Sequence, residues 1–162
     1  MNTSSRFVVA VHILVAMTLA QALRKLDCLT SDFLGASVNT NPVVIRRIIS
    51  RLRKAGLVDS QPGAGGGSML ARDPEHLTLQ EVYEAVEAGD LFHLHYSEPN
   101  PYCPIGANIQ TALKGTLEAA ETSMLQSLAQ TTVASIAEKL KEPAMAYLAT
   151  QETAEISVDQ TS

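Results

Sequence analysis

Five cationic side chains crowd into one short stretch of the chain and have the chemistry of a phosphate-binding surface. Guanidinium groups offer paired N–H donors that match phosphate oxygens and the major-groove edge of guanine. Apolar residues recur at positions 44/45, 48/49 and 52, so residues 42–55 are predicted to form a helix with one buried stripe. Such a helix fits the major groove of duplex DNA, where its N-terminal residues reach base edges. The cationic residues are Arg46, Arg47, Arg51, Arg53 and Lys54.

A cysteine at the predicted start of another helix has the chemistry of a redox sensor. Cys103 directly precedes Pro104, which is typical of the first helical position because its missing N–H costs nothing there. A thiolate at a helix N-cap is stabilised by the helix dipole and by free N–H groups. Cys103 is therefore a sensor candidate, and the alternative is a residue that only caps or packs. Cys28 is expected to pack in the N-terminal domain, and a Cys28–Cys103 disulfide stays open because sequence gives no geometry.

Other residues with catalytic or metal-binding chemistry form no recognisable site. His93 and His95 lie near Cys103, but their spacing matches no zinc pattern. The glycines of 63–67 are not followed by the Lys and Ser/Thr of a P-loop. Two cysteines are too few for an all-cysteine iron–sulfur site within one chain. We therefore expect no enzyme, no metal and no cofactor. A solvated helix face is the interpretation of Glu81, Glu84 and Glu87.

Capping residues place the basic helix second in a helix-turn-helix. Residues 30–38 are predicted to form a short helix that Thr30 or Ser31 caps. A polar break follows, after which Asn41 is expected to cap the basic helix with Pro42 at its first position. Two helices joined by a tight polar turn are typical of a DNA-binding helix-turn-helix.

A glycine-tipped hairpin is predicted directly after the basic helix. Gly56 is expected to end that helix in the left-handed conformation. Residues 57–60 and 68–72 are the candidate strands, and the turn between them is rich in glycine. Thr78 and Glu81 then form a predicted capping box for a further helix. The predicted fold is mainly α with a small β-hairpin, a winged helix-turn-helix.

The C-terminal half is predicted to hold a long helix that needs a partner. Residues 1–88 form the expected DNA-binding domain, and the polar, proline-containing residues 89–103 form a connecting or sensor loop. A helix over 104–141 follows, and its apolar stripe is too long for one small domain to cover. We therefore predict a dimerisation helix, followed by an acidic tail, 142–162, that frays in part. The predicted dimer contacts are Ile109, Leu113, Leu117, Ala120, Met124 and Leu128.

Charge is divided unevenly along the chain, and the N-terminus is strongly apolar. The net charge is −5, but residues 1–73 carry nine Lys and Arg against four acids, whereas residues 74–162 carry three against thirteen. The basic half favours a nucleic-acid partner. The apolar run from Phe7 to Leu23 fits either a signal peptide or a buried helix. The module that follows favours the buried helix and a cytoplasmic protein without a membrane partner.

Three stretches of the chain resemble a family of bacterial winged-helix regulators. They are SVNTNPVVIRRIISRLRKAGLVDSQPGAGGGSMLAR at 37–72, SSRFVVAVHIL at 4–14 and LTLQEVYEAVE at 77–87. These stretches are similar to the Rrf2 family, which includes the iron–sulfur regulator IscR, the nitric-oxide regulator NsrR and the cysteine-metabolism regulator CymR. The resemblance implies a homodimer that binds a pseudo-palindromic operator and usually represses transcription.

The resemblance also implies a set of DNA contacts and shows two departures. Cluster-binding relatives carry three cysteines in the loop before the long helix, whereas this chain carries only Cys103 there. The approach to the wing, Ser60–Pro62, lacks the basic residue that enters the minor groove in several relatives. The implied contacts are Ser4, Ser5 and Arg6 to the DNA backbone, Thr40, Asn41, Val43, Arg46, Arg47 and Arg51 on the helix-turn-helix, and Gly65 and Gly66 in the wing.

A winged helix that binds protein partners is the alternative function. The long helix would then be a docking surface. The basic face of residues 46–54 separates the two hypotheses, because a protein-docking winged helix does not need five cationic residues there.

Overall fold

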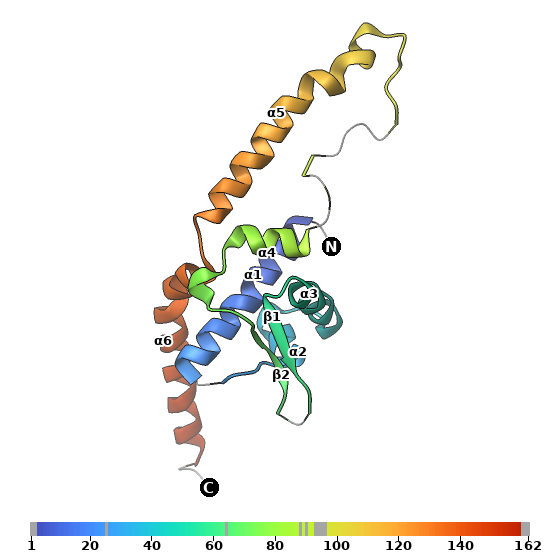
Figure 1. Cartoon of the computed structure of the whole chain (residues 1–162). Helices are drawn as coiled ribbons and strands as arrows, with labels where there is room; N and C mark the ends of the chain where they lie inside the picture. Colours follow the sequence, from blue (N-terminus) through green and yellow to red (C-terminus); the bar gives the residue numbers. More distant parts are fainter. Residues whose placement is uncertain are drawn as a thin grey trace.

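The computed structural model of the chain describes residues 3–24, 26–63, 65–87, 89, 91–92 and 97–159, with side chains from Ser5 to Leu148. Most of the described residues lie in helices, and one β-hairpin stands between the third and fourth α-helices (Figure 1). The elements are α1 (Thr3–Leu19), η1 (Ala20–Arg24), α2 (Ser31–Val38), α3 (Pro42–Lys54), β1 (Val58–Gln61), β2 (Gly67–Leu70), η2 (Pro74–His76), α4 (Leu79–Val86), α5 (Pro104–Ala129) and α6 (Val133–Asp159).

Helix α1 is the centre of the hydrophobic core. It packs against α2, α3, α4 and α6, and its residues Ala10, Ile13 and Leu14 are fully buried. By length and composition alone, the stretch Ser5–Arg24 with mean hydropathy 1.8 is apolar enough to cross a membrane. The fold instead uses the apolar side chains of α1 to join the helix-turn-helix to the C-terminal helix, as the buried-helix interpretation predicts.

The helix-turn-helix forms where the caps predict it. The Thr30 side chain accepts the Phe33 N–H at 3.2 Å at the start of α2, and Asn41 Oδ1 accepts the Val43 N–H at 2.8 Å at the start of α3. Gly56 has φ +71°, the left-handed conformation expected just after α3. Helix α3 buries four apolar side chains against the core, which fixes its opposite face toward solvent. These are Ile45, Ile48, Ile49 and Leu52.

The wing is a two-stranded antiparallel hairpin that follows α3. Strand β1 pairs with β2 so that Val58 faces Leu70 and Ser60 faces Ser68. The base of the hairpin is tied to the segment before α2, because Leu29 and Ser68 exchange two backbone hydrogen bonds of 2.8 and 2.9 Å. The wing and the start of α2 are therefore held in one unit.

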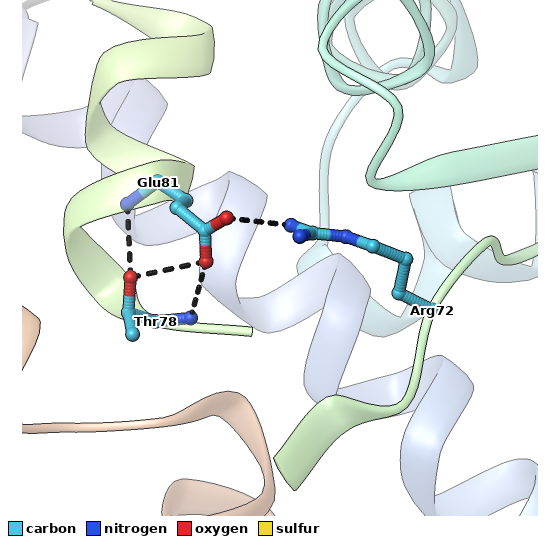
Figure 2. Close-up of polar contacts among 3 residues, drawn as sticks. All are labelled: Arg72, Thr78 and Glu81. Atoms are coloured by element: carbon cyan, nitrogen blue, oxygen red, sulfur yellow. Dashed lines mark hydrogen bonds and ion pairs between the residues drawn. The ribbon is translucent and has the colours of Figure 1, made fainter. Parts of the chain in front are cut away.

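The predicted capping box is present at the start of α4 and extends to an arginine from the segment after β2 (Figure 2). Thr78 Oγ1 accepts the Glu81 N–H, and Glu81 Oε2 accepts the Thr78 N–H at 3.0 Å. The other carboxylate oxygen of Glu81 lies 2.7 Å from Arg72 Nη2. Burial alone raises the pKa of Glu81, but the Thr78 N–H and Arg72 outweigh it, so the net pKa is below the ordinary 4.5.

The single helix predicted over 104–141 is instead two helices. Helix α5 ends at Ala129, and α6 begins at Val133 and continues past Pro143 to Asp159. The break is held by backbone bonds to the segment before α4: the Leu79 N–H donates to Thr131, and the Val133 N–H donates to Leu77. Thr132 then caps α6 by accepting the Ser135 N–H at 3.2 Å. Helix α6 consequently returns to pack along α1, while α5 projects away from the body of the protein (Figure 1).

Candidate nucleic-acid interface

The exposed face of α3 carries the residues that the sequence predicted to meet DNA. Val43 is 45% exposed, and Arg46 and Arg47 are exposed on the same helix. Arg46 Nη2 lies 3.8 Å from Asp32 Oδ1, and both side chains are largely in water, so this pair is weak. The face is therefore free to exchange that contact for a phosphate or a base.

Asn41 and Thr40 stand where α2 turns into α3. Asn41 uses its side-chain oxygen for the cap, which leaves its amide N–H groups for a ligand. Thr40 is half-buried, and its backbone N–H donates to Gly35 at 2.9 Å. A Cβ on Gly35 would lie 3.0 Å from the Thr40 carbonyl oxygen, so the tight turn favours glycine at this position. The turn thereby fixes the position of the α3 N-terminus relative to α2.

The wing glycines differ in what they do. Gly65 has φ +79° and is exposed with open space around it. A Cβ on Gly66 would lie 2.1 Å from the Gln61 carbonyl oxygen, so the hairpin itself requires glycine there. The turn geometry accounts for Gly66 without DNA, whereas Gly65 remains available for close approach to a backbone.

Arg6 and Arg51, two of the implied DNA contacts, also make contacts within the chain, and their contact with DNA stays a prediction. Arg6 Nη2 pairs with Glu87 Oε2 at 3.0 Å, with side-chain exposures of 25% and 2%. Arg51 Nη1 donates to the carbonyl oxygen of Val86, the last residue of α4. Both guanidinium groups thus hold the C-terminal end of α4 against α1 and α3. Carbonyl groups at a helix end attract cations, which explains why these arginines turn inward.

The three glutamates predicted to form one solvated face have separate environments. Glu81 is the half-buried capping residue, and Glu84 is exposed and accepts a 2.7 Å hydrogen bond from Gln80. Glu87 is buried, and its side chain reaches no hydrogen-bond donor with good geometry despite its ion pair with Arg6. The solvated-face interpretation was wrong for Glu87, because α4 ends at Val86 and the chain turns Glu87 toward Arg6. A lone acid at a helix end opposite an arginine 81 positions earlier gives no local sequence signal.

The N-terminal serines, Ser4 and Ser5, lie in the first turn of α1. Ser5 is half-buried, and the side chain of Ser4 lies outside the described side chains. The implied contact of these serines with the DNA backbone stays a prediction.

Cys103 occupies the N-cap position of α5, as predicted. The N–H groups of Gly106 and then Ile105 lower the pKa of the thiol below its ordinary value, against a smaller opposing effect of burial. The Cys103 side chain makes no cap hydrogen bond of normal geometry. Cys103 is half-exposed and free.

Cys28 lies beside the wing rather than beside Cys103. Its thiol donates to Gln61 Oε1, with a sulfur–oxygen distance of 3.4 Å. Cys103 is the N-cap of α5, and the N-terminus of α5 is the end of that helix far from the hairpin (Figure 1). The two cysteines of one chain therefore lie apart. Both are free.

Helix α5 presents the predicted dimer stripe with little cover. None of its 26 residues, all of which the structure describes, is buried. Ile109, Leu117, Met124 and Leu128 are half-buried, and Leu113 is 44% exposed. The remaining residue of the predicted stripe, Ala120, is exposed.

The residues of this chain do not fit the cysteine-ligated cluster that the resemblance implies. The whole sequence has two cysteines, and only Cys103 lies in the loop before α5. Among the described residues, no three His, Cys, Asp or Glu side chains are grouped to hold a metal ion. His93 and His95 lie outside the described residues.

Comparison with known proteins agrees with this arrangement. Residues 3–139 match the Rrf2 family, described as iron-dependent transcriptional regulators. YwnA of Bacillus subtilis, described as an HTH-type transcriptional regulator, is 40% identical over 126 residues, covering 78% of this chain and 90% of YwnA. A crystal structure described as a DNA-binding protein is 37% identical with a TM-score of 0.62, over 81% of this chain and 97% of that one. A transcriptional regulator from Lactobacillus plantarum has 25% identity and a TM-score of 0.68, over 91% and 97%.

Proposed function

The chain belongs to the Rrf2 family and is a DNA-binding transcription regulator, and we propose that it acts as a cytoplasmic homodimer that represses transcription from a pseudo-palindromic operator. The observation that carries the proposal is the pairing of an exposed basic helix, α3, with an uncovered helix, α5, in one chain. The first supplies contacts to a duplex, and the second supplies the partner surface. The basic face of α3 and the apolar stripe of α5 are both left largely uncovered by the described part of a single chain.

A second copy of the chain is the partner that α5 suits. A 26-residue helix is about 39 Å long at 1.5 Å per residue, and none of its residues is buried within one chain. Its largest hydrophobic side chains lie three or four residues apart and define one stripe, so two such helices bury each other's stripes along their length. A two-fold axis then places two copies of α3 on one side of the dimer.

The dimer geometry predicts the form of the operator. Two recognition helices related by a two-fold axis read half-sites about 34 Å apart, one helical turn of DNA. The half-sites are inverted repeats because the protein is symmetric. Repression follows if the operator overlaps a promoter.

In vitro selection of random duplex DNA with the full-length protein tests this function. The proposal expects enrichment of an inverted repeat with half-site centres about 10 base pairs or a multiple apart. Enrichment of no sequence, with DNA binding that is equal for all duplexes, would contradict it. Absence of any binding to duplex DNA would favour the protein-docking winged helix instead.

A redox response through Cys103 is a second proposal, supported by the lowered pKa of its thiol. Cys103 stands where the loop from the DNA-binding domain enters α5, so oxidation there alters the junction that sets the separation of the two α3 helices. A thiolate loses two electrons to peroxide and becomes a sulfenic acid, while peroxide is reduced to water. A coupling of about 1–3 kcal/mol changes operator affinity roughly 5–150-fold.

Operator affinity before and after mild peroxide tests the redox response. The wild-type affinity is expected to change, and Cys103→Ser is expected to abolish the change, whereas Cys28→Ser is the matched control that keeps it. Equal affinity of the oxidised and reduced wild-type protein would return Cys103 to a capping role.

A further inference from the structure

A small hollow lies between the start of α2, the exposed side of α3 and the wing. Its volume is about 200 Å³. Residues of α2, α3, β1 and β2 line it, and the Leu29–Ser68 backbone bonds hold β2 against the segment before α2. The lining residues are Ser31, Arg46, Ile49, Ser50, Arg53, Ser60 and Ser68.

The lining has the composition of an oxyanion site. Four hydroxyl groups and two guanidinium groups surround the hollow, and its lining within the described part of the chain contains no carboxylate. Asp59 precedes Ser60 on β1 and so points to the opposite face of the hairpin. Asp32 approaches Arg46 at 3.8 Å but does not line the hollow.

Apart from Arg46, which lies 3.8 Å from Asp32, the side-chain donors of this hollow are not used by the fold of the described residues. The side chains of Arg53 and of the four serines make no hydrogen bond or ion pair with any other residue that the structure describes. Ser68 is only 7% exposed and lines the hollow, and its hydroxyl makes no hydrogen bond to another described residue. Water or a ligand in the hollow can supply that partner.

We propose that this hollow binds one phosphate of the DNA backbone, with Arg53 and Ser60 as its principal ligands. The inference deepens the proposed function and rests on it. Arg46, Ser50 and Arg53 are spaced at i, i+4 and i+7, so they share one side of α3. A strand that leaves the major groove beside α3 passes between that side and the wing, which is where the hollow lies.

The site explains how the wing contributes without a basic residue at its approach. Ser60 lines the hollow from β1, and the following Gln61 and Pro62 carry no charge. The wing then supplies hydroxyl donors, while α3 supplies the positive charge. Phosphate contacts of this kind fix the register of the protein on DNA and are independent of base sequence.

Salt-dependent binding of Arg53→Ala to duplex DNA tests the site. The probes are the duplex obtained by in vitro selection and a duplex of unrelated sequence. The variant is expected to weaken binding to both by the same factor, roughly tenfold, and to lower the salt slope by about one for each chain bound. Lys139→Ala, which removes one positive charge from α6, is the matched control and keeps the wild-type slope. Ser60→Asp places a carboxylate in the hollow and is expected to weaken binding more than Ser60→Ala does.

A scan of neutral methylphosphonate linkages along the selected duplex locates the phosphate. One linkage in each half-site is expected to weaken the wild-type protein and to leave Arg53→Ala almost unchanged. Wild-type salt slope and affinity in Arg53→Ala, or no linkage that distinguishes the two proteins, would overturn the site while leaving the DNA-binding function intact. Saturable binding of inorganic phosphate that requires Arg53, with an unchanged slope on DNA, would assign the hollow to a free anion and also overturn the proposal. A wild-type protein that binds neither duplex would overturn the proposed function itself.

Discussion

The buried pair of Arg6 and Glu87 predicts a loss of stability, not of DNA contacts, when it is broken. Glu87→Gln removes the negative charge and leaves Arg6 with three-quarters of its side chain out of water. Removing one partner of a fully buried pair costs about 3–5 kcal/mol. The Arg6 side chain is 25% exposed, and the new amide can still accept a hydrogen bond. We therefore expect the free energy of unfolding to fall by about 2–3 kcal/mol.

Thermal unfolding followed by circular dichroism measures this loss. For a chain of 162 residues, 2–3 kcal/mol lowers Tm by roughly 4–12 °C, compared at one protein concentration because dimers unfold in a concentration-dependent way. Glu84→Gln, an exposed change on the same helix, is the control and is expected to move Tm little. The double variant Arg6→Met with Glu87→Met is expected to be more stable than Glu87→Gln, because both charges are gone.

A further variant, Arg6→Ala, separates the ion pair from a DNA contact at Arg6. Arg6→Ala is expected to lower Tm and to keep the salt slope of DNA binding at a temperature where it is folded. An unchanged Tm with a salt slope reduced by about one would refute this reasoning and return Arg6 to the DNA backbone.

Four further predictions concern α3, α4 and iron–sulfur binding. If Arg46 or Arg47 reads guanine, its replacement by Ala is expected to cost about 1–3 kcal/mol of operator binding and to relax specificity at one base pair. If it binds phosphate, the replacement is expected to weaken binding to all duplexes equally. Unchanged binding of the double variant would exclude this face of α3 as the DNA-binding surface. Thr78→Ala is expected to destabilise the protein by about 1 kcal/mol. Because the folded pKa of Glu81 lies below 4.5, its stabilising effect is present above pH 4.5 and is lost as the pH falls through the lower folded value. Glu81→Gln is therefore expected to flatten the pH dependence of the free energy of unfolding in that acidic range. An unaltered pH profile would contradict the role of the Glu81 carboxylate in the cap. Anaerobically purified protein is expected to lack the visible absorbance of an iron–sulfur chromophore, and stoichiometric iron and sulfide would show that two cysteines suffice.

The local signals in the sequence were sufficient for the DNA-binding half. Thr30, Asn41 and the Thr78–Glu81 box each form hydrogen bonds to residues two or three positions away, so a short stretch of sequence is enough to predict them. Gly56 and the glycine-rich turn act in the same local way. These short-range interactions place α3 and the wing without reference to the rest of the chain.

The long-range interactions gave no comparable signal. The α5–α6 break depends on backbone bonds from Thr131 and Val133 to Leu77 and Leu79, more than fifty positions away. An apolar stripe continued weakly across this break, so helical periodicity predicted one helix. The Thr132 cap, with Ser135 three positions later, was the local signal that could have located it.

The contacts of Arg6 and Arg51 within the chain were not predicted, for the same reason. Arg6 and Arg51 belong to a basic half of the chain, and their charge favoured DNA until the fold placed the end of α4 beside them. Charge pattern alone does not tell an arginine that binds phosphate from one that holds a helix end.

Sedimentation equilibrium of the full-length protein, alone and with its selected duplex, measures the oligomeric state on which the operator model depends. A homodimer is expected to give twice the chain mass without DNA and a complex of two chains on one duplex. Replacing Leu113 and Leu117 by Asp on the α5 stripe is expected to give a folded monomer with greatly weakened operator binding. A wild-type protein that stays monomeric at micromolar concentration and binds its operator as one chain per duplex would contradict the account.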